Sequence, residues 1–450
     1  MANLFRIVLL LFFNIVFVIC INSKEFLTPE QIHLSYGVDP TRMVVTWSTM
    51  NKTQSSFGLI SSANSGQAPT PFVGKSSLFV DPGTLHHFQF IHTVEFTNLK
   101  PGMEYIYMVG SKPEGIWSKS YTFKAMKDSA NWSPHIALYG DFGFSNHRSL
   151  QRLNIDHESR MYDAIFHVGD LAYDMDSDNG YQGDRFLNMV QNLTAELPYM
   201  TCPGNHENAY NFTHYKRRFT MPTDEDGDRM FYSFNIGPAH VISLSTEYYF
   251  YIQYGIMQPV RQYFWLLDDL KEANKPENRA QRPWIITMGH RPMYCSNTDH
   301  DDCTKHHSLV RDGVPLIDVG GLEKMFYEQG VDLSIWAHEH SYERLFPVYR
   351  DKVLNGSTNA PYTNPRAPVH VTTGSAGCQE DHDAFVPDPR PWSAYRSDDY
   401  GYTRMKIYNN THLYMEQVSD DKDGAIIDNF WLIKDKHGPY DSPISLKNVH

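Results

Sequence analysis

The first third of the chain alternates between apolar and polar positions in short runs. Turn-forming residues separate these runs, which cover residues 32–36, 43–47, 88–96, 105–109 and 120–123. Alternation of this kind is typical of strands that bury one face, and several such strands at short intervals favour two packed antiparallel sheets. We therefore predict a β-sandwich domain over residues 28–127.

One segment of this region resembles a known fold family. Leu99, Pro101, Gly102 and Tyr105 lead into an alternating strand. This corner is similar to the one that precedes a late strand of fibronectin type III domains, and the resemblance implies a fibronectin type III-like N-terminal domain. No group of catalytic side chains stands out within it, so we expect it to serve structure or recognition.

Beyond residue 134 the pattern changes to apolar strands that alternate with amphipathic helices. Buried strands are predicted at residues 135–139, 164–168, 284–288 and 331–336. Helical spacing runs from Pro259 to residue 273, and a second helix over residues 322–329 should end at Gly330. Residues 402–432 alternate again. We expect a second domain of α/β or α+β class over residues 134–434, with C-terminal strands from about residue 400.

The N-terminus carries the features of a secretory signal. Arg6 precedes an apolar run over residues 7–21 that only Asn14 interrupts. This run is shorter than a membrane-spanning helix normally needs. We predict a signal peptide over residues 1–22, with an uncleaved membrane anchor as the alternative, and no membrane span in the rest of the chain.

Glycosylation sequons agree with passage through the secretory route. N-glycans are expected at Asn51, Asn192, Asn211, Asn355 and Asn409, and Asn131 is a sixth match to the motif. These sites predict a secreted, extracellular glycoprotein, and a lysosomal destination is the alternative.

The cysteines suit an oxidising compartment. Removal of Cys20 with the signal leaves four, an even number. Because the loop between them is short, we predict a disulfide between Cys295 and Cys303. Cys202 and Cys378 either form a second bridge or remain free, buried thiols.

The charge balance narrows the range of partners. The formal net charge is −13 at pH 7, and the chain has no run of Lys and Arg that could follow a nucleic-acid backbone. We therefore expect no nucleic-acid partner, and a small phosphate ester suits the chain better as a ligand.

Side chains that bind hard metals directly follow the predicted strands. The candidates are Asp141, Asp170, Tyr173, Asn205, His290, His338 and His340. Loops at the carboxyl ends of strands in an open α/β sheet converge on one crevice, so residues distant in sequence can meet there. His338 and His340 are two residues apart, which in an extended segment turns both imidazoles to one side and Glu339 to the other.

These blocks, in this order, resemble the motif set of the purple acid phosphatases within the calcineurin-like metallophosphoesterases. The similarity covers about residues 135–432, and the sandwich before it is similar to the N-terminal domain of the larger members. The resemblance implies a four-layer domain in which two packed mixed sheets are flanked by helices. It also implies a cofactor that consists of Fe(III) and one divalent ion, which is zinc, iron or manganese.

The family's metal-binding roles carry over by position. The resemblance implies that Asp141, Tyr173 and His340 hold Fe(III), that Asn205, His290 and His338 hold the divalent ion, and that Asp170 bridges the two. Tyr173 is the most discriminating of these residues. Its phenolate is a hard oxygen donor that favours Fe(III), and other metallophosphoesterases generally lack it.

Two histidines outside the metal set receive catalytic roles from the resemblance. His206 would form a hydrogen bond to the substrate phosphate or to the nucleophile. His300, ten residues after His290, could protonate the leaving alkoxide. Asp299 stands where plant relatives often have histidine, so the identity of the general acid stays open.

Two positions depart from the family pattern without removing a ligand. Ala337 stands where the family usually has Gly, and Thr287 replaces the usual Val. The alanine adds one methyl group before the histidine pair, so some strain on the metal loops is possible.

The resemblance implies an acid phosphatase that hydrolyses phosphate monoesters by attack of a metal-bound hydroxide. One alternative is a zinc-dependent phosphodiesterase or nucleotidase on the same scaffold. Another is a glycoprotein binding module with a vestigial metal site, against which the retention of every ligand argues. The sequence names neither the physiological ester nor the oligomeric state.

Overall fold

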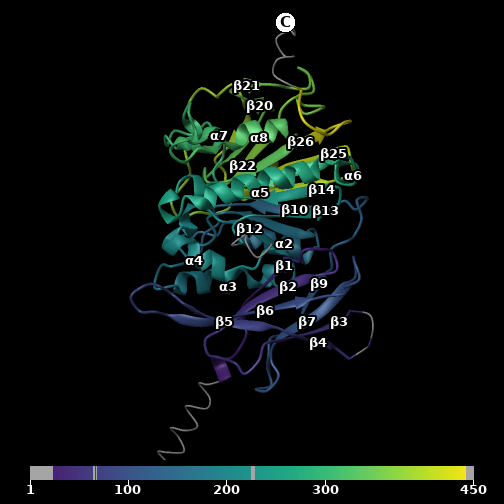
Figure 1. Cartoon of the computed structure of the whole chain (residues 1–450), viewed down its shortest axis with the longest axis vertical. Coiled ribbons are helices and arrows are strands. Elements are labelled where there is room, and N and C mark those ends of the chain that lie inside the picture. The colour runs from purple at the N-terminus through teal and green to yellow at the C-terminus, as the bar shows by residue number, and fades with distance from the viewer. Residues whose placement is uncertain (1–23, 64–65, 67, 224–228, 442–450) are drawn as a thin grey trace, which may run out of the picture.

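The computed structural model describes residues 24–63, 66, 68–223 and 229–441. The predicted signal peptide lies outside these ranges. None of the helices within them combines the length and hydrophobicity that a membrane span requires. The chain forms a β-sandwich at one end of an elongated molecule and a larger domain with two sheets and flanking helices above it (Figure 1).

The N-terminal sandwich consists of two antiparallel sheets, with strand orders β1-β2-β6-β5 and β4-β3-β7-β8; β9 also pairs with β7. The strands are β1 (Glu30–Tyr36), β2 (Met43–Thr49), β3 (Phe57–Ser62), β4 (Thr70–Val73), β5 (Lys75–Val80), β6 (Phe88–Phe96), β7 (Glu104–Ser111), β8 (Ile116–Trp117) and β9 (Tyr121–Lys124). Alternation in β6 buries His92, Val94 and Phe96 on one face of the strand. The predicted β-sandwich is confirmed.

The larger domain contains two mixed sheets, as the resemblance implied. The six-stranded sheet has the order β12-β11-β10-β24-β25-β26, and the seven-stranded sheet has the order β13-β14-β15-β18-β22-β19-β23. The strands of the first are β10 (His135–Tyr139), β11 (Ala164–Val168), β12 (Tyr199–Cys202), β24 (Gly401–Ile407), β25 (His412–Ser419) and β26 (Ala425–Ile433). Those of the second are β13 (Tyr232–Ile236), β14 (Ala239–Ser243), β15 (Trp284–Met288), β18 (Leu333–Trp336), β19 (Tyr342–Leu345), β22 (Val369–Thr373) and β23 (Ser393–Ser397).

Helices flank these sheets. They are α2 (Leu150–Glu158), α3 (Tyr181–Thr194), α4 (Ala209–Arg218), α5 (Met257–Ala273), α6 (Pro276–Gln281), α7 (Leu309–Asp312) and α8 (Leu322–Glu328). Helix α5 begins two residues before the predicted start, so Pro259 lies in its first turn. Backbone N–H groups there have no acceptor within the helix, so a proline, which lacks the N–H, is tolerated. Helix α8 ends before Gly330, which adopts the expected left-handed conformation with φ of 65°.

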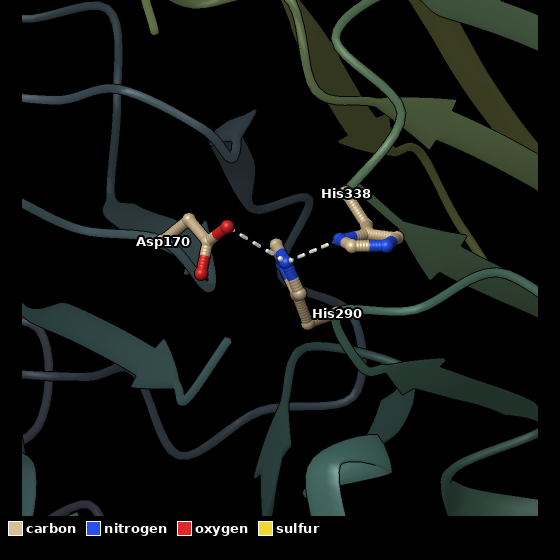
Figure 2. A group of neighbouring side chains, drawn as sticks. All are labelled: Asp170, His290 and His338. Atoms are coloured by element: carbon tan, nitrogen blue, oxygen red, sulfur yellow. Dashed lines mark hydrogen bonds and ion pairs between the residues drawn. The ribbon is translucent and has the colours of Figure 1, made fainter. Parts of the chain in front are cut away.

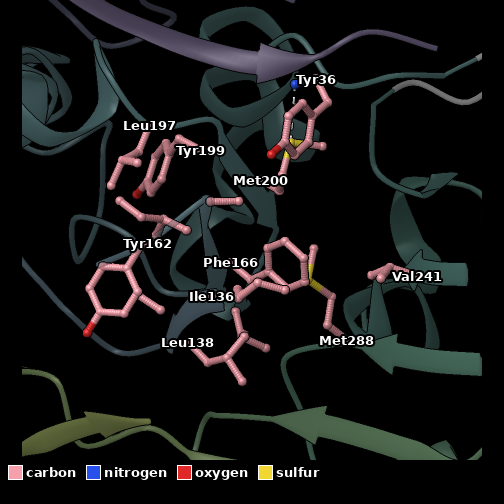
Figure 3. Close-up of a cluster of buried hydrophobic side chains, with 14 of the residues drawn as sticks. Tyr36, Ile136, Leu138, Tyr162, Phe166, Leu197, Tyr199, Met200, Val241 and Met288 are labelled. Atoms are coloured by element: carbon pink, nitrogen blue, oxygen red, sulfur yellow. Dashed lines mark hydrogen bonds between the residues drawn. The ribbon is translucent and has the colours of Figure 1, made fainter. Parts of the chain in front are cut away.

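A continuous apolar core joins the sandwich to the larger domain. Figure 3 shows Tyr36 of β1 near Met200 of β12, and residues of both large sheets packed together below them. The Tyr36 amide lies 3.4 Å from Met200 Sδ, and its hydroxyl donates to the Asp163 carbonyl at 3.1 Å. The sandwich therefore supports the sheet from which several candidate ligands project.

A buried polar network also connects the two domains. Asp184 of α3 accepts hydrogen bonds from Arg218 at 2.7 Å and from Gln89 of β6 at 2.9 Å, and it lies 2.9 Å from His87 Nε2. Asp184 and Arg218 are buried. Because both charges are removed from water, the hydrogen bonds between them are needed to offset the cost of desolvation.

The predicted disulfide and surface sites can be placed directly. Cys295 and Cys303 form the expected disulfide, with their Cα atoms 5.4 Å apart, while Cys202 and Cys378 are free and buried. The sequon residues Asn51, Asn131, Asn192 and Asn409 are exposed, and Asn211 and Asn355 are half-buried.

Candidate metal centre

The seven predicted ligands come from the carboxyl ends of strands in two facing sheets. Asp141 follows β10, Asp170 and Tyr173 follow β11, and Asn205 follows β12, all in the six-stranded sheet. The other three follow β15 and β18 of the seven-stranded sheet; they are His290, His338 and His340. The facing sheets therefore bring together oxygen donors from one sheet and imidazoles from the other.

Four of these ligands occupy an unfavourable backbone conformation. The φ angles are 54° for Asp141, 49° for Asp170, 54° for Tyr173 and 73° for His338. A side chain makes the left-handed region costly, by about 1–3 kcal/mol for each residue, and such residues gather at functional sites. The packing around these loops holds the ligands in place against that cost.

Glycines beside the ligands permit close contact between the two sheets. A Cβ atom on Gly169 would lie 2.4 Å from His290 Nδ1. A Cβ atom on Gly140 would lie 2.3 Å from the Cβ of Ala337. The extra methyl group of Ala337 is thus accommodated by the glycine that follows β10 in the facing sheet.

The other departure from the family pattern also has a partner. The Thr287 hydroxyl donates to the Ser334 hydroxyl on the neighbouring strand at 2.9 Å. A buried hydroxyl in place of a valine methyl therefore has its hydrogen bond satisfied, as burial requires. Neither departure displaces a candidate ligand.

Asp170, His290 and His338 form the first half of the cluster, and Figure 2 shows them converging from three separate loops. His290 Nε2 lies 3.1 Å from Asp170 Oδ2 and 3.2 Å from His338 Nδ1. The same nitrogen lies 3.1 Å from the side-chain oxygen of Asn205. These are the residues that the resemblance assigned to the divalent ion and to the bridge.

Asp141, Tyr173 and His340 form the second half. The Tyr173 hydroxyl lies 2.8 Å from His340 Nε2 and donates to Asp141 Oδ1 at 3.3 Å. Asp141 Oδ1 is also 4.0 Å from His290 Nε2, which connects this half to the first. All seven predicted ligands are therefore brought into one cluster, in which Asn205 and His338 are half-buried and the other five are buried.

The outer nitrogens of the three imidazoles are fixed by other groups. His290 Nδ1 lies 2.9 Å from the Val168 carbonyl, and His340 Nδ1 lies 2.9 Å from the Asp381 carbonyl. His338 Nε2 contacts the Asp301 carboxylate. Hydrogen bonds of this kind set the tautomer and turn the other ring nitrogen toward the cluster, as is usual for histidines that bind metals.

Charges within the cluster perturb one another strongly. Burial raises the pKa of Asp141 to about 7 and that of Tyr173 well above its usual value. Burial opposes ionisation of His290 too, but Asp170 and Asp141 outweigh it and raise the pKa of His290 to about 10. Two buried carboxylates so close together can both be ionised only if positive charge lies between them.

The donor set fits a pair of metal ions. Two buried carboxylates, a phenol and an amide oxygen are hard donors, and three imidazoles suit a divalent transition metal. Among the described residues, neither Asp141 nor Asp170 forms an ion pair with Lys or Arg. Bound cations would supply the positive charge that Lys and Arg do not provide to these carboxylates.

The path of the chain between His338 and His340 differs from the prediction. We expected an extended segment, but the residues form a bend in which His338 is left-handed. Both rings still reach the cluster. The His338 amide donates to Asp141 Oδ2 at 2.8 Å, and this hydrogen bond to the opposite sheet stabilises the bend.

The two predicted catalytic histidines lie in different environments. His206 borders the cluster: its ring centroid lies 4.4 Å from that of Tyr173, and its Nε2 lies 3.9 Å from Asp170 Oδ2. His300 is exposed, on the loop that the disulfide closes. The structure thus brings His206 to the site and leaves His300 at the surface, while the neighbouring Asp301 contacts His338.

Sequence reasoning missed the residues that hold the ligands from behind. The buried Glu207 accepts hydrogen bonds from the amides of Asp170 at 3.0 Å and Leu171 at 2.9 Å. Arg291 lies 3.1 Å from Asp301 and 3.0 Å from the buried Glu247. Glu207 and Arg291 each directly follow a predicted site histidine, a signal that could have marked both.

Three family models match the chain. They are "Purple acid Phosphatase, N-terminal domain" at residues 29–125, "Calcineurin-like phosphoesterase" at residues 134–342 and "Iron/zinc purple acid phosphatase-like protein C" at residues 367–429. The chain is 53% identical to "Acid phosphatase type 7" of Danio rerio and to that of Homo sapiens, and each alignment covers 91% of this chain and 92% of the relative. "Probable purple acid phosphatase 20" of Arabidopsis thaliana is 29% identical over 91% of this chain and 89% of its own.

A solved structure agrees with these matches at the level of the fold. Purple acid phosphatase PPD1 from yellow lupin superposes with a TM-score of 0.75 at 21% identity, over 91% of this chain and 75% of that chain. The two-sheet domain is that of a calcineurin-like metallophosphoesterase. The chain belongs to the purple acid phosphatase family, which confirms the resemblance seen in the sequence. It is an enzyme of the phosphoesterase class.

Proposed function

We propose that the enzyme is an acid phosphatase that hydrolyses phosphate monoesters at a pair of Fe(III) and one divalent ion, which is zinc, iron or manganese. The position of the Tyr173 hydroxyl carries the proposal, because it lies between His340 Nε2 at 2.8 Å and Asp141 Oδ1 at 3.3 Å. A phenolate beside a carboxylate and an imidazole is a hard donor set that favours Fe(III). Relatives named acid phosphatase type 7 support the activity.

Each predicted ligand has a place in this proposal. Fe(III) would be held by Asp141, Tyr173 and His340, and the divalent ion by Asn205, His290 and His338. Asp170, whose Oδ2 lies 3.1 Å from His290 Nε2, would be shared. When bound, the ions would lower the pKa of water and neutralise the charge that develops on the phosphoryl oxygens.

His206 is proposed to orient the substrate phosphate. Its Nδ1 lies 3.0 Å from Asp174 Oδ1, so a proton on Nδ1 is donated to that carboxylate. Burial opposes a charge on His206, but Asp170, Asp174 and Glu380 outweigh it and raise its pKa to about 10, so Nε2 carries a proton as well. Nε2 lies 3.9 Å from Asp170 Oδ2 and 3.4 Å from Glu380 Oε2, and it can donate to a phosphate oxygen while the ring lies against Tyr173. His206 therefore binds the substrate without occupying a ligand position.

His300 is proposed to give the leaving alkoxide its proton. The residue is exposed and lies three positions before Cys303, on the loop closed by the Cys295–Cys303 disulfide. A short, closed loop limits how far the imidazole can move away from the crevice. Asp301 on the same loop already contacts His338, which keeps the loop close to the cluster.

We also propose that the protein is secreted as a glycoprotein, to the extracellular space or to the lysosome. Four exposed sequon asparagines and one disulfide support this proposal. Expression in animal cells should yield protein in the medium whose mobility increases after enzymatic removal of N-glycans. Retention of the full chain in the membrane fraction would instead support an uncleaved anchor.

The proposed activity can be tested on the purified glycoprotein. Elemental analysis should find iron with one other metal ion, and p-nitrophenyl phosphate should be hydrolysed faster at acidic pH than at neutral pH. Zinc without iron, together with preferential hydrolysis of bis(p-nitrophenyl) phosphate, would favour the phosphodiesterase alternative. Full metal occupancy without release of phosphate from any ester would refute catalysis altogether.

A further inference from the structure

A buried carboxylate without a hydrogen-bond donor lies directly behind the metal centre. Glu339, between His338 and His340, is 0% exposed. No described residue donates a hydrogen bond to its Oε2. Its Oε1 lies 3.0 Å from Cys303 Sγ, but this sulfur belongs to a disulfide and has no proton to donate. An isolated buried carboxylate is very costly unless a cation or a proton neutralises it.

The neighbours of Glu339 are also acidic. One oxygen each from Asp299, Glu339 and Asp383 lies within 4.8 Å of the others. Asp299 is exposed and Asp383 is half-buried, so the group runs from the surface to the interior. Within the described parts of the chain, no Lys or Arg forms an ion pair with any of the three. Asp383 accepts a hydrogen bond from the His340 amide at 2.7 Å and lies 3.6 Å from His340 Nδ1, and Asp299 accepts one from the Asp301 amide at 3.2 Å.

The nearby Asp301 does not belong to this group. Its carboxylate is already engaged by Arg291 at 3.1 Å and by His338. The remaining carboxylates therefore repel one another with no described cation between them, while the Glu339 oxygen without a donor is held inside the protein. This arrangement is expected of an oxygen-lined cation site.

We propose that Asp299, Glu339 and Asp383 bind a calcium ion, in a site separate from the catalytic metal pair. Calcium takes six to eight oxygen ligands at about 2.3–2.6 Å, so two ligands on opposite sides lie about 5 Å apart. The three carboxylate oxygens lie within 4.8 Å of one another, so one ion between them can contact all three. Magnesium, at about 2.0–2.1 Å, requires near-ideal octahedral geometry, which carboxylates on three separate loops suit less well than the flexible geometry of calcium. Water reaches the exposed Asp299 and can complete the shell.

The calcium ion would tie together three loops that frame the active site. Asp299 lies on the disulfide loop, Glu339 between two metal ligands, and Asp383 on a loop that follows β22. The first and third loops already pair through the Thr298 amide and the Ala384 carbonyl, at 2.9 Å. A cation between them would fix the backbone from which His338 and His340 project, and would neutralise acidic charge beside the metal centre.

Equilibrium dialysis of the purified holoenzyme against radioactive calcium tests this proposal. We expect saturable binding of one calcium ion per chain after dialysis into calcium-free buffer, with weak competition from magnesium. Glu339→Gln and Asp299→Asn each remove one negative ligand and should weaken binding by at least about tenfold. Asp388→Asn, an exposed carboxyl outside the group, serves as the matched control and should bind calcium like the wild type.

The outcomes separate this proposal from the proposed function, on which it does not depend. Absence of saturable binding, or unchanged affinity in both variants, overturns the calcium site even if phosphate is released. If Glu339→Gln fails to fold, Asp299→Asn decides alone, because its side chain is exposed. Calcium binding that depends on these residues supports the site even if the purified protein hydrolyses no ester.

Discussion

The hydroxyl of Tyr173 lies 2.8 Å from Nε2 of His340, although 167 residues separate them in the chain. The two side chains project from different sheets, one after β11 and the other after β18. Asp141 completes this corner at 3.3 Å from the same hydroxyl. Packing of the two sheets thus assembles the oxygen-rich half of the metal centre, and the properties of the enzyme should follow from that contact.

Asp301 should control the affinity for the divalent ion through His338. Its carboxylate contacts His338 Nε2, which leaves Nδ1 to face His290 Nε2 at 3.2 Å. Loss of such a carboxylate typically lowers metal affinity by about 10–100-fold. Asp301→Asn should therefore lose the divalent ion at low metal concentration while it retains iron, as elemental analysis after dialysis would show.

The exposed Asp388 provides the control for this experiment. Asp388→Asn should keep both metals under the same conditions. Loss of iron and the divalent ion in equal measure from Asp301→Asn would indicate general disruption of the site. Unchanged metal content would show that Asp301 does not position His338.

The network around Asp184 should make stability depend on pH. Burial alone would raise the pKa of Asp184, but the charge of Arg218 and the hydrogen bond from His87 lower it below its usual value. Because the folded pKa lies below the unfolded value of about 3.9, the stabilisation is fully present above about pH 4 and is lost as pH falls below it. Asp184→Asn should lower the free energy of unfolding by about 3 kcal/mol at neutral pH, since it leaves Arg218 buried without its partner.

Urea unfolding of wild type and Asp184→Asn between pH 3 and pH 7 measures this effect. The difference between the two proteins should shrink on the acidic side of about pH 4. Asp178→Asn breaks the exposed pair with Arg185 and should cost less than about 1 kcal/mol at any pH. A difference that stays constant with pH would contradict the role given to Asp184.

A proton donated by His300 should matter only for substrates with poor leaving groups. An alkoxide needs a proton when it departs, whereas p-nitrophenolate leaves readily without one. We expect His300→Ala to slow hydrolysis of an alkyl phosphate by about 100-fold and to change that of p-nitrophenyl phosphate little. His306→Ala, another exposed histidine of the region, is the control. Equal effects on both esters would exclude His300 as the general acid.

The ligands could be predicted from the sequence because sheet topology makes them converge. Asp141, Asp170 and His290 each follow an apolar strand, and the carboxyl ends of neighbouring parallel strands meet whatever the loops between them do. The strands themselves were clear from their apolar runs. This reasoning places Asp141 with Asp170, and His290 with His338, each pair at the edge of its own sheet. That the two edges face each other results from the packing of the two sheets.

The groups that hold the ligands could not be predicted in the same way. That Asp301 contacts His338 while His300 stays exposed depends on the path of an irregular loop, which no hydrophobic pattern fixes. The bend at His338 depends on a hydrogen bond to Asp141 from the other sheet. The burial of Glu339 likewise results from loops that pack over it. The sequence predicted only that its side chain points away from those of His338 and His340.

The most direct test of the account is the visible absorption spectrum of the iron-loaded enzyme before and after the substitution Tyr173→Phe. A phenolate bound to Fe(III) absorbs visible light, and phenylalanine supplies no oxygen while it preserves the packing of the ring. We predict a coloured wild type and a variant that loses the band although elemental analysis still finds iron. An unchanged band in Tyr173→Phe, or a colourless wild type with full iron occupancy, would contradict the assignment of Tyr173 as an iron ligand.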